Sequence, residues 1–129
     1  MRFITALILF FACQPAVAGW QPWDKQRAED VVHCASIYGG AAYGIENHPY
    51  NPSEGQSAED VRDHFQRLSN ILRYFVTNSG REDDMRKAFD TALKETIARV
   101  DEAKTVDVLY DDITKCDGAV DKLYSYYTQ

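Results

Sequence analysis

Apolar residues recur every three or four positions along most of the chain after residue 24, and this spacing limits the fold more than any other feature. A period of this length gathers apolar side chains on one face of a helix, whereas a half-buried strand alternates every second residue. The pattern predicts one helix over residues 24–46, a second that starts at Ser57 and stops at Asn78-Ser79-Gly80, and helical segments from Glu82 onward. We therefore expect an all-α fold.

The first residues have the composition of a secretory signal. Arg2 supplies a positive charge, residues 3–12 are apolar, and Ala16-Val17-Ala18 gives a small-x-small cleavage pattern. The apolar run is shorter than the roughly 20 residues of a membrane-spanning helix. We predict a signal peptide over residues 1–18, a single helical domain over residues 19–129, and export to the periplasm, with the extracellular space as the alternative.

A second way of processing the N-terminus is lipid attachment at Cys13, which would anchor the exported protein to a membrane. Residues 10 and 11 are both phenylalanine, and such sites usually have small or aliphatic residues there. Cleavage after Ala18 is therefore the favoured interpretation.

Removal of residues 1–18 leaves two cysteines, Cys34 and Cys116. In an oxidising compartment an even pair favours a disulfide, and two buried free thiols are the alternative. Bridged Cα atoms lie within about 7 Å of each other. We measure height along the bundle from the end where the first and third predicted helices begin, at about 1.5 Å per residue. An unbroken helix from Glu82 would place Cys116 at a height of roughly 50 Å, whereas Cys34 lies at a height of roughly 15 Å.

The disulfide therefore predicts that the chain reverses near residues 103–107, where Thr105 can cap a new helix. A reversal there brings Cys116 back to the level of Cys34. The expected architecture is an up-down-up-down four-helix bundle with one interhelical disulfide.

No catalytic or metal motif stands out in the chain. Asp30 and His33 have a ligand-like spacing once, but the residue three positions before His64 is Val61, so a paired di-iron motif is incomplete. A Gly-x-Ser-x-Gly motif and a haem-attachment motif are both missing. We expect no enzymatic activity, no metal and no cofactor.

The formal net charge is -6, and acidic residues are spread along the predicted helices. Nucleic acids and anionic membranes are themselves negatively charged, so neither is an expected partner. The charge favours a protein partner with a basic surface.

Two neighbouring segments are unusual for a helical bundle. Three glycines, Gly39, Gly40 and Gly44, lie inside the first predicted helix, where they either let another helix approach closely or shape a recess for a ligand. The proline-containing connection over residues 47–56 is long for a bundle, and it serves either as a stiff connector or as a binding loop. The binding residues predicted at this end are His48, Tyr50, Asn51, Glu54 and Asp112.

The competing location for a site is an aromatic cluster where both chain termini are expected to meet. Its members are Trp20, Trp23, Tyr124, Tyr126 and Tyr127. Aromatic side chains of this kind either close the end of a bundle or anchor an interface.

In layout, the chain is similar to small helical immunity proteins that act against periplasmic cell-wall-degrading toxins and combine a signal peptide, a helical domain and a cysteine pair. That likeness implies a protein that inhibits, neutralises or escorts a partner. A carrier of a small apolar ligand and a structural component of an envelope complex are the alternatives.

Overall fold

The computed structural model describes residues 25–77 and 82–127, with side chains described for residues 29–74 and 83–122. The predicted signal peptide over residues 1–18 and the lipid-attachment site at Cys13 lie outside this part of the chain. The described residues form four α-helices and one short 3-10 helix. Their bounds are α1 Lys25–Asn47, α2 Ala58–Thr77, α3 Glu82–Ala103, η2 Val106–Leu109 and α4 Tyr110–Tyr127. The prediction of an all-helical chain is confirmed.

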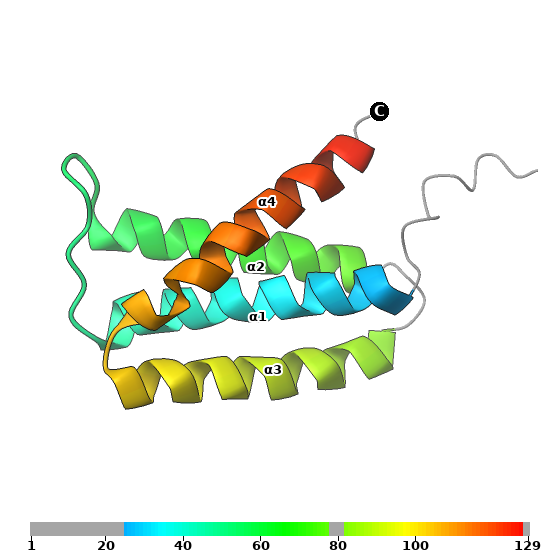
Figure 1. The fold of residues 1–129 in the computed structure, drawn as a ribbon, viewed down its shortest axis with the longest axis horizontal. Helices are drawn as coiled ribbons and strands as arrows, with labels where there is room; N and C mark the ends of the chain where they lie inside the picture. The colour runs from blue at the N-terminus through cyan, green and yellow to red at the C-terminus, as the bar shows by residue number, and fades with distance from the viewer. Residues whose placement is uncertain (1–24, 78–81, 128–129) are drawn as a thin grey trace, which may run out of the picture.

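The first three helices lie side by side, and each runs in the direction opposite to the one before it (Figure 1). Helix α4 starts beside the end of α3 and crosses the other helices obliquely (Figure 1). The regular packing of four helices into an up-down-up-down bundle stays a prediction.

Helix α1 is the centre of the molecule. It packs against α2, α3 and α4, whereas α2 and α3 touch each other only slightly. Its buried face includes Ile37 and Tyr38, with 1% and 0% of their surface exposed. Leu72 of α2, Val100 of α3 and Leu109 of η2 complete the core around it. The core is therefore built on one buried helix.

The glycines of α1 lie where side chains of α3 and η2 pack closely against it. A methyl group added at Gly40 would overlap the Thr96 side chain of α3. A methyl group at Gly44 would lie 2.9 Å from Val100 Cγ1 and 3.2 Å from Val106 Cβ. Neighbouring side chains therefore fill the space above these two glycines, which supports the packing interpretation rather than the recess.

The helix boundaries follow local hydrogen bonding. The Ser57 hydroxyl accepts a 3.0 Å hydrogen bond from the Asp60 amide and so caps the start of α2. Helix α3 ends before Lys104, which has a φ of 60°. Thr105 then caps η2 by accepting a 3.1 Å hydrogen bond from the Asp107 amide. The predicted break at residues 103–107 and the capping role of Thr105 are confirmed.

Cys34 of α1 and Cys116 of α4 form a disulfide, with Cα atoms 5.5 Å apart. Both residues are buried. The predicted pairing is confirmed, and it links the first helix of the described chain to the last.

Candidate functional site

The connection between α1 and α2, residues 48–57, projects beyond the ends of both helices (Figure 1). Most of its residues are exposed, including Asn51 and Glu54. The loop has internal order, because the Gln56 amide donates a 3.0 Å hydrogen bond to the Ser53 carbonyl across a turn. Gly55 has a φ of 85° in this turn, a conformation that glycine adopts without strain. The loop therefore presents polar groups on a defined turn.

Three side chains, which we call the loop brace, fix the base of this loop: Tyr43, His48 and Asp101. The His48 Nε2 atom lies 2.8 Å from Asp101 Oδ1. A carboxylate can only accept, so Nε2 is the donor of this bond. The Tyr43 hydroxyl donates to both carboxylate oxygens, at 2.9 Å and 3.0 Å. The brace thereby ties the first residue of the loop and the last turns of α1 to α3.

The charge of Asp101 is stabilised by this arrangement. Hydrogen bonds from His48 and then from Tyr43 hold the pKa of the Asp101 carboxyl below its usual range. The same contact raises the pKa of the Tyr43 hydroxyl, because loss of its proton would leave an anion facing the Asp101 carboxylate. The brace is thus built to hold an ionised carboxylate between two donors.

The predicted binding residues have different surroundings. His48 belongs to the brace, and Tyr50 is half-buried against the hydrophobic core. Asn51 and Glu54 are exposed on the loop. Asp112 lies in the first turn of α4, where one of its carboxylate oxygens accepts a 2.9 Å hydrogen bond from Arg99 of α3. Their role in binding stays a prediction.

The end of the molecule that carries the loop is strongly acidic. Among the described side chains there, the basic ones are Arg62, Arg99 and Lys104, and Arg99 is paired with Asp112. Arg62 is occupied by ion pairs with Glu46, Glu59 and Asp63. The acidic side chains at this end are Glu46, Glu54, Glu59, Asp60, Asp63, Asp101, Glu102, Asp107, Asp111 and Asp112.

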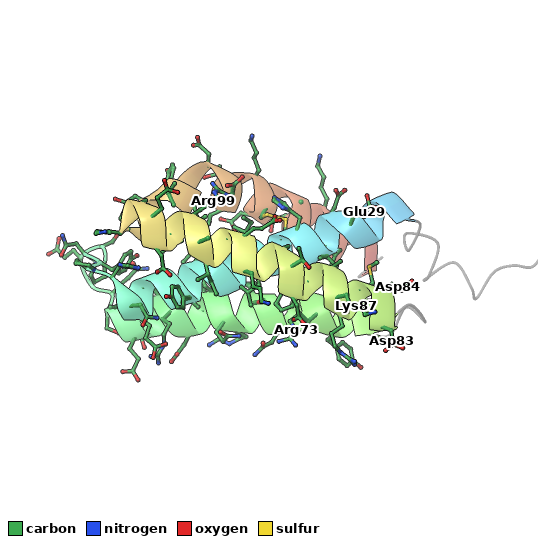
Figure 2. The ribbon with its side chains drawn as sticks, turned by 90° about the horizontal axis from the view of Figure 1, so that it is seen from below. Glu29, Arg73, Asp83, Asp84, Lys87 and Arg99 are labelled. Carbon is green, nitrogen blue, oxygen red and sulfur yellow. A yellow bond between two sulfur atoms is a disulfide. The ribbon has the colours of Figure 1, made fainter. Side chains whose placement is uncertain are left out.

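The opposite end carries both signs of charge. Figure 2 shows Arg73 and Lys87 toward that end, together with Glu29, Asp83 and Asp84. The Arg73 guanidinium also lies over the Phe89 ring, 4.6 Å from its centroid, and so links α2 to α3. The negative charge of the described surface is therefore concentrated around the loop.

Sequence reasoning did not identify Asp101 or Tyr43 as part of this region. Asp101 lies 53 residues after His48, and only the fold brings the two together. The sequence does contain one local sign that Asp101 has a special role. Asp101 and Glu102 lie at the C-terminal end of α3, and no basic residue is found in its last turn. Acidic groups at that end oppose the helix dipole, so their presence there is a sign of another role.

Other possible sites have less support. The predicted aromatic cluster of Trp20, Trp23, Tyr124, Tyr126 and Tyr127 lies outside the described side chains. Among the described side chains, residues 29–74 and 83–122, no group of three or more histidine, cysteine, aspartate or glutamate residues is arranged to hold a metal ion. None of the helices described combines the length and the apolar character that a membrane span requires.

Comparison with protein-family models, with curated proteins and with solved structures finds no match to this chain. The structure defines this chain by its physical features: it is all-helical and disulfide-linked, with a braced loop at its acidic end.

Proposed function

We propose that this chain is an exported binding protein that recognises a basic surface on a protein partner through the loop 48–57. The observation that carries the proposal is the combination of an exposed turn and a fixed base. Hydrogen bonds from Tyr43 and His48 hold Asp101 beneath a loop whose tip carries Asn51 and Glu54. Such a loop loses little conformational freedom on binding, which favours affinity.

The charge around the loop supports a cationic partner. Acidic side chains predominate at this end, and two of the three acids that flank Arg62 are more than half exposed. Complementary charge accelerates encounter and selects among partners. An inhibitor, immunity or escort role, as the layout of the sequence implies, requires this kind of recognition and no reaction chemistry.

The packing of α1 favours protein binding over carriage of an apolar ligand. A carrier would need space beside Gly40 and Gly44, and side chains from α3 and η2 occupy that space. The disulfide is compatible with an exported protein, since such bonds persist in oxidising compartments. The periplasmic location and the absence of catalysis are part of this proposal.

The test is affinity capture from an envelope extract followed by titration calorimetry with the captured protein. Glu54→Lys reverses one exposed charge on the loop. The matched control is Asp90→Lys, which makes the same change at an exposed position on α3 away from the loop. We expect Glu54→Lys to weaken binding roughly two- to tenfold at low salt, with a smaller effect at high salt.

Asn51→Ala is a second loop variant that leaves the charge unchanged, and it is expected to weaken binding at both salt concentrations. If Asp90→Lys reduces affinity as much as Glu54→Lys, binding depends on net charge and the loop is not the site. A partner that binds all three variants as tightly as the wild type also contradicts the proposal.

A further inference from the structure

Little of the described part of helix α4 is buried. Among its described side chains, residues 110–122, Cys116 is the one that is fully buried. Ile113 and Val120 are half-buried, and Gly118 faces open space. Most of the stability of a helix in a protein comes from packing of its apolar face. Noncovalent packing therefore contributes little to holding residues 113–122 of α4.

The two halves of α4 are attached in different ways. Its first turn follows Leu109 of η2, which is fully buried, and the Arg99 side chain donates hydrogen bonds to the Val108 carbonyl and to Asp112. Figure 2 shows Arg99 on the side of α3 that faces α4. Beyond this turn, the Tyr38 hydroxyl of α1 donates a 2.6 Å hydrogen bond to Asp117, next to Cys116.

We propose that α4 is a redox-dependent latch, which lies on α1 when Cys34 and Cys116 are joined and swings away from about Asp112 onward when they are reduced. The anchored first turn acts as the hinge. Helices α1, α2 and α3 do not need the latch, because their shared core is made by Leu72, Phe89 and Val100 around α1.

The redox step is a two-electron exchange. Closing the latch forms one S–S bond as the two thiols lose two protons and two electrons to a disulfide oxidant, which becomes a dithiol. Opening is the reverse exchange with a dithiol reductant, whose thiolate attacks one sulfur and whose second thiol completes the transfer. Both cysteines are buried, so a reductant reaches the bond only through a local fluctuation that exposes it, which makes opening slow.

The experiment is amide hydrogen exchange on the full chain in three forms: disulfide-bonded, reduced by a dithiol with two free thiols verified by mass, and the double variant Cys34→Ser/Cys116→Ser. We expect the reduced protein and the double variant to lose protection over residues 113–122. Amides in α1, α2 and α3 should keep their protection in both. The disulfide-bonded variant Asp117→Asn should keep α4 protected, because the covalent bond remains.

Three results overturn the latch. Retained protection of residues 113–122 in the reduced protein or in the double variant shows that packing alone holds α4. Loss of protection in all helices together shows that the disulfide supports the whole fold rather than one helix. Opening of α4 in Asp117→Asn with the disulfide intact would make the Tyr38 bond, and not the disulfide, the fastening.

Discussion

The hydroxyl of Tyr38 donates a 2.6 Å hydrogen bond to a carboxylate oxygen of Asp117, the residue that follows the disulfide cysteine Cys116. The Tyr38 ring is buried and stacks on Phe65 of α2, with ring centroids 5.9 Å apart. One side chain of α1 therefore contacts α2 through its ring and α4 through its hydroxyl. Four predictions follow from this and from the other contacts described above, and a fifth concerns export.

Tyr38→Phe removes the bond to Asp117 and keeps the ring. We expect the free energy of unfolding to fall by about 1–2 kcal/mol, since hydrogen bonds to charged groups are among the stronger ones in proteins. Chemical denaturation of the disulfide-bonded protein gives the value. Asp117→Asn retains an acceptor and should cost less; equal stability of Tyr38→Phe and wild type would show that the bond contributes nothing.

Alkaline titration should distinguish Tyr38 from the exposed tyrosines. Burial, followed by the hydrogen bond to Asp117, raises the pKa of the Tyr38 hydroxyl far above its usual value. The folded state thus holds this proton more tightly than the unfolded state. The resulting stabilisation is complete below the usual tyrosine pKa of about 10 and declines as the pH rises above it.

Absorbance of tyrosinate measures this titration. We expect Tyr38→Phe to leave the folded titration curve below about pH 11 unchanged and to remove one titrating group from the curve of the unfolded protein. Ionisation of Tyr38 in the folded protein at or below the usual tyrosine pKa of about 10 would contradict the buried bond.

Two glycines should respond to alanine in opposite ways. Gly40→Ala introduces a methyl group against Thr96, and overpacking of this kind costs about 1–3 kcal/mol, more than the gain in helix propensity. Gly118→Ala in α4 meets no neighbour and should stabilise the protein by up to about 1 kcal/mol. Thermal melts followed by circular dichroism compare the two. A Gly40→Ala protein that melts at a higher temperature than the wild type would show that α3 shifts to accommodate the methyl group without a loss of stability.

The loop brace should weaken in acid. The pKa of Asp101 is lowered by His48 and Tyr43, so the brace contributes fully above the usual aspartate pKa of about 4 and is lost as the pH falls through the lower value of the folded state. Asp101→Asn should loosen the loop already at neutral pH. Amide exchange of residues 49–56 reports this, and Asp90→Asn is the matched control. Unchanged exchange in Asp101→Asn would show that the loop does not need the brace.

The predicted export determines the mass of the mature protein. We expect the protein recovered from the envelope fraction to begin at Gly19 and to gain two hydrogens on reduction, as one disulfide requires. Intact mass spectrometry before and after reduction tests both statements. A species that retains Cys13 with an attached lipid would instead establish the membrane-anchored alternative.

Features that depend on neighbouring residues in the sequence could be predicted closely. The predicted first helix over residues 24–46 compares with Lys25–Asn47 in the structure, and the caps at Ser57 and Thr105 lie where the sequence placed them. The cysteine pair also predicted the reversal after α3, because chain length and bond geometry leave few alternatives.

Features that depend on the approach of two helices could not be predicted in the same way. Glycines inside a helix permit either a recess or close packing, and the choice depends on which side chain of α3 lies opposite, as Thr96 does at Gly40. A periodic apolar face likewise does not specify the crossing angle of α4, since several angles satisfy the same pattern. Asp101 was missed because its partners come from another helix and a loop.

The central position of α1 also bears on how such a sequence can diverge. Since α2 and α3 each pack on α1 and scarcely on each other, a substitution in one outer helix seldom requires a compensating change in another. The outer surfaces, with the loop 48–57, can therefore drift toward new partners independently. Gly40 and Gly44 tolerate little variation, because an atom added at either position meets a neighbouring side chain. Proteins descended from this chain should therefore share the sequence of α1 long after their binding surfaces have changed.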